Sequence, residues 1–180
     1  MKKLTLLLLA GIAFSCNDAG TSSKEAMKDS SAIAVDTSTT MMNYPYTVKK
    51  PDNWEVGSTA NSMIALQSLK AWEEGKMDEA LKYFGDSIWL QFDALDKKMP
   101  NDSLKAMFTS SWNAYKTVKV TMNDFESVIS KDKSEEWVTL WYTQSWETKK
   151  GVKDSSSVIN DLQIKDGKIV RLAEHIRKLH

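Results

Sequence analysis

Two polar side chains near the end of the chain, Arg171 and His175, have the chemistry that proton transfer requires. A histidine can act as a general base near neutral pH, and an arginine can hold a carboxylate or an enolate-like oxygen. Both occupy odd-numbered positions of one predicted strand, so they share a face of the sheet. A simpler interpretation, which we favour, is that this strand ends at the mouth of a pocket and that both groups are solvated there.

Carboxyl groups are the other candidate bases. Asp86 and Asp93 stand at the two ends of a predicted strand. Asp86 falls where a helix gives way to that strand, a position where aspartate usually serves a turn, and Asp93 is expected to be an exposed strand end. Asp161 falls on the outward face in the strand register described below. We therefore favour structural roles for all three carboxyl groups, and we keep Asp86 as an alternative base.

The sequence predicts no metal centre and no cofactor. His175 and His180 are five positions apart, which matches neither one face of a strand nor one face of a helix, and no carboxylate cluster accompanies them. A glycine-rich phosphate loop and a nucleophile elbow of the form G-x-S-x-G are both missing from the sequence.

Aromatic residues are abundant, with seven tryptophans in 180 residues. Most are expected in the core, because each buries a large apolar area. Any that line a cavity would favour a flat, apolar ligand. The tentative ligand-binding set combines such rings with polar groups of the last two strands. Its members are Trp89, Tyr115, Asn160, Arg171 and His175.

The last two strands of the chain set the expected geometry of this site. Asp166-Gly167 joins two alternating segments, 158–165 and 168–176, and Asp-Gly is a strong signal for a two-residue hairpin turn. A regular antiparallel ladder from that turn pairs Leu162 with Arg171, Asn160 with Ala173 and Val158 with His175. One face would then be apolar near the turn and polar away from it, as expected of a pocket wall.

Helices are predicted before these strands. Ser58 is a candidate N-cap and Gly75 a candidate C-cap of the first helix, and Gly85 is expected to end a short second helix. The third helix opens at Pro100-Asn101-Asp102-Ser103. After Lys116 the apolar period changes to two, which predicts strands, including a long aromatic strand over 137–146.

This order of elements, together with Leu162-Gln163-Ile164-Lys165-Asp166-Gly167-Lys168-Ile169-Val170 and with Phe84-Gly85-Asp86-Ser87, resembles the NTF2-like, or SnoaL-like, superfamily. The resemblance covers roughly 58–178. It implies an α+β fold in which a curved antiparallel sheet packs on three N-terminal helices to form a cone with a pocket. Members include isomerases, cyclases, dehydratases and pocket proteins without known chemistry, so the fold does not give the activity. The tyrosine and aspartate set of the isomerases is not reproduced here.

The N-terminus predicts where the protein is located. Lys2 and Lys3 precede an apolar run, and Ala13-Phe14-Ser15 leads directly to Cys16, the only cysteine of the chain. Such a segment is typical of a signal peptide, here 1–15. The junction resembles the lipobox of bacterial lipoproteins, which implies cleavage before Cys16 and its lipidation. Phe14 departs from that pattern, because the family usually has a small residue there. We expect an anchor in the outer membrane, with the protein facing the periplasm or the cell surface.

The composition indicates a single domain that follows a flexible tether. Ten serines or threonines occur in 17–50, a stretch too polar to bury a core, so we expect 16–53 to be a flexible tether and 54–180 the domain. Loss of Lys2 and Lys3 leaves 22 basic against 24 acidic residues, which disfavours nucleic-acid binding.

The expected function is binding of a small, partly apolar ligand or of a partner protein, and we lean away from an enzyme. The alternatives are a proton-transfer isomerase or dehydratase using His175 or Asp86 with Arg171, and a structural dimer whose cone is filled. Because the 137–146 strand has aromatic rings on both faces, we also expect a homodimer.

Overall fold

The protein is represented by a computed structural model that describes residues 44–50 and 53–179. The predicted signal peptide, Cys16 and nearly all of the predicted tether lie outside the described residues. The compact unit that contains the predicted domain spans Tyr46–His180 and is considered by itself below. No helix of the described residues is long and apolar enough to cross a membrane.

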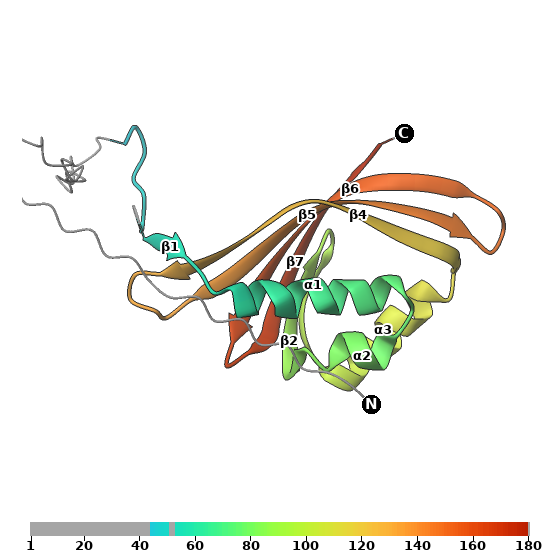
Figure 1. The fold of residues 1–180 in the computed structure, drawn as a ribbon, viewed down its shortest axis with the longest axis horizontal. Helices are drawn as coiled ribbons and strands as arrows, with labels where there is room; N and C mark the ends of the chain where they lie inside the picture. Colours follow the sequence, from blue (N-terminus) through green and yellow to red (C-terminus); the bar gives the residue numbers. More distant parts are fainter. Residues whose placement is uncertain (1–43, 51–52, 180) are drawn as a thin grey trace, which may run out of the picture. The chain divides into compact units, whose positions relative to one another are not determined.

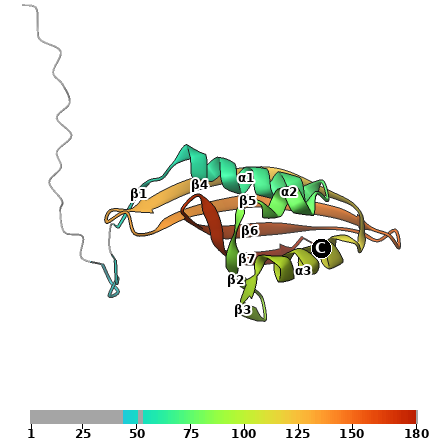
Figure 2. The same ribbon diagram turned by 90° about the horizontal axis from the view of Figure 1, so that it is seen from below.

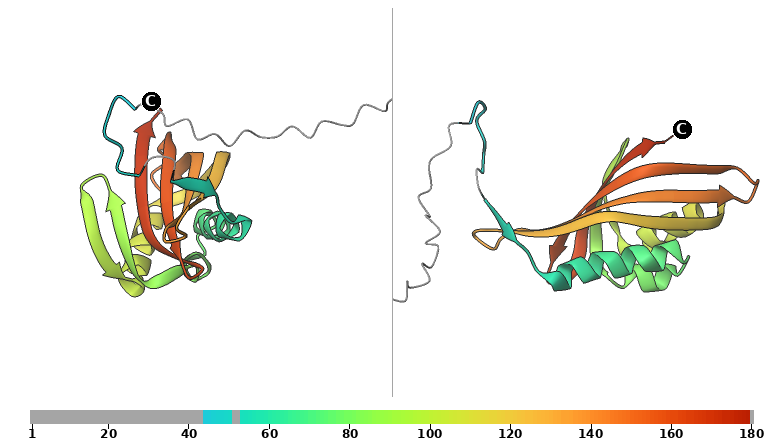
Figure 3. Two further views of the ribbon diagram at one scale, coloured as in Figure 1. Left: turned by 90° about the vertical axis from the view of Figure 1, so that its left-hand side faces the viewer. Right: turned by 45° about the horizontal axis from the view of Figure 1, so that its top comes forward.

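A seven-stranded sheet, in the order β1-β4-β5-β6-β7-β2-β3, forms the larger layer of this unit. All neighbouring pairs are antiparallel except β2 and β7, which are parallel. The long strands β4, β5 and β6 bend together along the sheet (Figure 3). The strands are β1 (Trp54–Val56), β2 (Phe84–Phe92), β3 (Leu95–Pro100), β4 (Tyr115–Ser130), β5 (Glu136–Thr148), β6 (Lys153–Lys165) and β7 (Lys168–Lys178).

Three helices cover one face of the sheet (Figures 1 and 2). They are α1 (Thr59–Glu73), α2 (Met77–Leu81) and α3 (Asn101–Trp112). The predicted N-cap of the first helix is confirmed, because the Ser58 hydroxyl accepts a hydrogen bond from the Ala60 amide. The C-cap is Glu74 rather than the predicted Gly75, which lies one residue further on with a φ of +73°. Glycine suits that position because it carries no Cβ.

Three details of the predicted element order are wrong. Gly85 does not end the second helix, because α2 stops at Leu81 and Gly85 already lies inside β2. Strand β3 was not predicted, since its mostly exposed and charged sequence lacks the alternation of a half-buried strand. Strand β1 was not predicted either, so the third helix follows three strands rather than one.

The core lies between the sheet and the helices. Its largest fully buried side chains come from β2, α3 and the β5–β6–β7 part of the sheet, and they include Ile88, Leu104, Leu140 and Ile169. Burying such side chains contributes about 1.5–3 kcal/mol each, so these four residues are a main source of stability.

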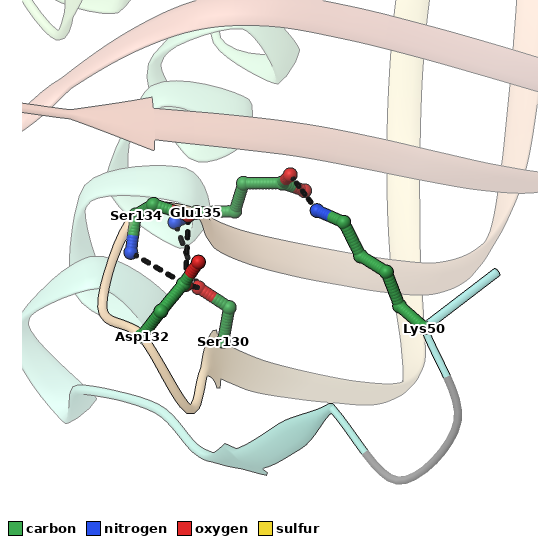
Figure 4. Close-up of polar contacts among 5 residues, drawn as sticks. All are labelled: Lys50, Ser130, Asp132, Ser134 and Glu135. Atoms are coloured by element: carbon green, nitrogen blue, oxygen red, sulfur yellow. Dashed lines mark hydrogen bonds and ion pairs between the residues drawn. The ribbon is translucent and has the colours of Figure 1, made fainter.

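The segment that leads into the domain is held at the β4–β5 turn (Figure 4). The Lys50 ammonium pairs with the Glu135 carboxylate at 2.5 Å. Within the turn, the Asp132 carboxylate accepts hydrogen bonds from the hydroxyls of Ser130 and Ser134 at 2.5 and 2.7 Å. These bonds, with that of the Ser134 amide, lower the pKa of Asp132 to about 2. The segment before the domain therefore contacts a β4–β5 turn whose side chains are hydrogen-bonded to one another.

Candidate functional site

A cavity of about 330 Å³ lies between the helices and the inner face of the sheet. Its wall is mostly apolar and aromatic, and it is formed by all three helices and five strands. Ser111 and Ile176 are exposed members of the wall, so they mark the mouth of the cavity. The apolar lining includes Ala65, Phe84, Phe92, Phe108, Leu140 and Leu162.

Polar groups gather on one side of this cavity, on β5, β6 and β7. Asn160 and Glu174 are cross-strand partners of β6 and β7, and both line the cavity. The buried Tyr142 hydroxyl accepts a hydrogen bond of 3.1 Å from Asn160 Nδ2. The other amide atom, Asn160 Oδ1, is buried and receives no hydrogen bond from any of the described residues. The cavity therefore holds a carboxyl, a phenol and an amide side by side.

Burial changes the proton affinity of these groups. It raises the pKa of the Glu174 carboxyl to about 7, because the charged form is poorly solvated there. Burial first, and then the neighbouring Glu174 charge, raises the pKa of the Tyr115 and Tyr142 hydroxyls. Glu174 can thus gain or lose a proton near neutral pH, while both tyrosines stay protonated.

Strand register decides which residues of β7 face the cavity, and here the sequence prediction is wrong. Lys165 pairs with Lys168 and Ile164 with Ile169 as predicted, but Gln163 then pairs with Arg171. Val170 is therefore an extra residue, a β-bulge, and every later residue of β7 points to the opposite face from the one predicted. Leu172 and Glu174 face the cavity.

Arg171 and His175 lie on the outer face of the sheet for this reason. Both line a groove on that face and neither lines the cavity. The Arg171 guanidinium lies 4.2 Å from the ring centroid of Trp89 and 5.3 Å from that of Trp137. Gln91 Oε1 accepts a hydrogen bond from Arg171 Nε at 2.7 Å. The arginine is thus held between two tryptophans rather than presented to a ligand in the cone.

Trp89 also lies on the outer face, so its predicted place in the pocket is wrong. Its indole Nε1 donates a hydrogen bond of 2.5 Å to Asp96 Oδ1. The inner-face neighbours of Trp89 along β2 are Ile88 and Leu90, which are fully buried. Strand alternation therefore directs Trp89 outward.

Tyr115 and Asn160 do line the cavity, as the sequence analysis expected, and their part in ligand binding stays a prediction. The alternative base Asp86 is exposed on β2 and does not line the cavity, and Asp93 is exposed in the β2–β3 turn. Asp161 faces outward as predicted and accepts a hydrogen bond of 2.7 Å from the Thr139 hydroxyl.

Glu174 and Tyr142 are two functional candidates of the cavity wall that the sequence analysis did not select. One signal for Glu174 was present in the sequence. Ile169 and Leu172 are both large and apolar and stand three positions apart, so both can be buried on one face only if the strand contains an extra residue. Both are in fact buried.

Among the described residues, no group of three or more histidine, cysteine, aspartate or glutamate side chains could hold a metal ion.

Comparison with known proteins assigns the fold. Neither a protein-family model nor a curated protein matches the chain. Similar solved structures include an NTF2-like protein of unknown function from Burkholderia pseudomallei, with a TM-score of 0.56, 12% identity, and coverage of 67% of this chain and 92% of that one. The domain has an NTF2-like fold. The α+β expectation with a curved sheet on helices is thereby confirmed.

Two other structures with the same fold are described as enzymes. A putative hydroxylase from Streptomyces galilaeus, AclR, has a TM-score of 0.56 and 14% identity, with coverage of 68% of this chain and 82% of that one. An M. tuberculosis LEH-like epoxide hydrolase has a TM-score of 0.55 and 12% identity, with coverage of 67% and 84%. At such identities the likeness extends to the fold alone.

Proposed function

We propose that the cone of this NTF2-like domain binds a small, partly apolar molecule. The observation that carries the proposal is the aromatic-lined cavity of about 330 Å³, open at its mouth, with a single carboxyl, Glu174, on its wall. This volume is at the lower end of ordinary ligand pockets. Apolar walls supply affinity and a few polar groups fix orientation, which is the division of roles found in small-molecule sites. An open cavity of this size does not fit the alternative of a filled cone.

Native mass spectrometry of the full-length protein from its own cell envelope tests this proposal. We expect a bound small molecule on the wild type. Ser111→Trp places an indole at the mouth and should remove the bound mass. Ser110→Trp is the matched control, because Ser110 is an exposed neighbour on α3 that does not line the cavity. Absence of any adduct on the wild type, or equal adducts on all three proteins, would contradict the proposal.

A proton-transfer enzyme, such as an isomerase or dehydratase, is the second candidate. It is favoured by Glu174, whose pKa of about 7 suits a general base. The hydroxyls of Tyr115 and Tyr142 would supply hydrogen bonds to a developing oxyanion. In this proposal Glu174 takes the role that the sequence analysis gave to His175 or Asp86, since neither of those lines the cavity.

We further propose that the domain is anchored to the outer membrane through a lipidated Cys16 and the 16–53 tether. The lipobox-like junction of Ala13-Phe14-Ser15 and Cys16 supports this proposal. A ligand-binding domain on such an anchor would work at the cell envelope, facing either the periplasm or the cell surface.

A homodimer through the outer face of the sheet is also proposed. Trp89, Trp137 and Trp141 lie on this face and are only partly buried. Covering such rings is the usual way in which interfaces gain energy. Sedimentation at tens of micromolar should show twice the protomer mass, and Trp141→Glu should shift it toward the monomer. A clean wild-type monomer would exclude the dimer.

A further inference from the structure

We propose that the ligand of the cavity carries a protonated amine, held by Glu174 and Asn160 among aromatic rings. This inference rests on the proposed ligand-binding function and adds the chemical class of the ligand. Its basis is that the cavity offers hydrogen-bond acceptors and negative charge without a matching cation.

The charge of the cavity wall has one sign. Glu174 is the only acidic or basic residue among the lining residues, which include no lysine, arginine or histidine. Among the described residues, no cation or hydrogen-bond donor contacts the Glu174 carboxyl, and only desolvation shifts its proton affinity. The cavity groups near it are neutral: Asn160 on β6, Phe92 on β2 and the hydroxyls of Tyr115 and Tyr142. Glu174 also lines the outer groove together with Arg171, His175 and Lys178, but none of these three side chains pairs with its carboxyl. A cationic ligand would supply the missing counter-charge.

One buried hydrogen-bond acceptor of the cavity wall also lacks a partner among the described residues. Asn160 is only 6% exposed, yet no donor within residues 44–50 and 53–179 reaches its Oδ1. A buried acceptor left in this state costs free energy comparable to a lost hydrogen bond. Because Asn160 and Glu174 are cross-strand partners that both line the cavity, we expect one ligand nitrogen to reach the oxygens of both. A protonated amine has N–H donors and no acceptor, which fits this pair.

Aromatic rings complete the site. Phe92 is the cross-strand neighbour of Glu174 on β2 and stacks on Phe108 with 6.4 Å between ring centroids. Tyr115 and Tyr142 line the same cavity and are near enough for the Glu174 charge to raise the pKa of their hydroxyls. Ring faces attract cations, most strongly where water is excluded. The same rings and the carboxylate repel an anionic ligand, so the site discriminates by charge as well as by shape.

Titration calorimetry at pH 8 with three probes of one shape tests the inference on the full-length protein. The probes are benzylamine, benzyl alcohol and benzoate. We expect benzylamine to bind at least tenfold tighter than benzyl alcohol, and benzoate to bind more weakly than either. Benzylamine affinity should fall as the pH drops below 7, because Glu174 then becomes neutral.

Two variants that each remove one carboxyl identify the carboxyl that binds the amine. Glu174→Gln should reduce benzylamine affinity about tenfold or more and leave benzyl alcohol affinity unchanged. Asp161→Asn removes a carboxyl from the outer face and should leave both affinities unchanged. If benzyl alcohol binds as tightly as benzylamine, or if Glu174→Gln binds benzylamine as the wild type does, the amine inference is overturned while the proposed ligand-binding function stands. If no probe binds and the native protein carries no small mass, both are overturned.

Discussion

The Glu174→Gln variant is expected to be more stable than the wild type at neutral and alkaline pH. Burial raises the pKa of Glu174 from 4.5 to about 7 in the folded protein. Each unit of such a difference corresponds to 1.36 kcal/mol, so the ionised carboxylate costs up to about 3 kcal/mol of folding stability above pH 7. Glutamine keeps the shape of the side chain without that charge.

The sign of the pH dependence follows from proton binding. Between pH 4.5 and 7 the folded protein holds a proton on Glu174 that the unfolded chain has released. The stabilisation by this group is therefore complete below pH 4.5 and disappears as the pH rises through 7. The variant and the wild type should be equally stable near pH 4 and differ most near pH 8.

Denaturant unfolding of both proteins at pH 4.5, 6 and 8 measures the difference. Other carboxyl groups titrate in the opposite sense: the lowered pKa of Asp132, about 2, means that its stabilisation is lost only as the pH falls. Because such groups are present in both proteins, their contributions cancel in the difference between the two free energies of unfolding. A difference that does not change with pH would show that Glu174 is not held in a desolvated site.

The Cys16→Ser variant is expected to lose the lipid label completely and to accumulate as the unprocessed precursor. The prediction rests on the junction before Cys16, since a serine hydroxyl cannot replace the thiol as the acyl acceptor. A single acyl chain gives only marginal membrane binding, whereas several chains anchor a protein stably. The variant should therefore lose almost all of its stable membrane anchoring.

Palmitate labelling in the source cells, followed by fractionation of the envelope, checks this result. Ser15→Ala is the matched control, because it keeps a small residue before the cleavage point and leaves Cys16 in place. We expect the control to be labelled and retained like the wild type. A labelled Cys16→Ser protein would refute the lipobox interpretation and leave the domain without its proposed anchor.

Much of the fold could be predicted from the sequence because the signals are local. Ser58 caps α1 through its own hydroxyl, and Asp166 and Gly167 adopt the positive φ angles of 51° and 69° that the hairpin turn requires. The alternation of apolar residues on β6 also placed Asn160 correctly on the cavity wall. Each of these features depends on residues within a few positions in the chain.

Which side chains of β7 point into the cavity depends instead on residues that are far away in the sequence. In the regular register Arg171 would point into the cone and Leu172 to the outside. The bulge at Val170 lets Ile169 and Leu172 both be buried, and it leaves Arg171 between Trp89 and Trp137 on the other face. Strand β2 takes part in the choice, because its parallel pairing with β7 also shifts register between Phe84 and Trp89.

The sequence by itself thus determined most of the element types, the hairpin turn and the α+β class, since these follow from local backbone preferences and apolar periodicity. Only the tertiary structure decided that Glu174, rather than His175 or Arg171, lies in the cavity. The physical reason is that one inserted residue moves all later side chains of a strand to the opposite face of the sheet. The position of that inserted residue is set by the burial of side chains against β2 and β6.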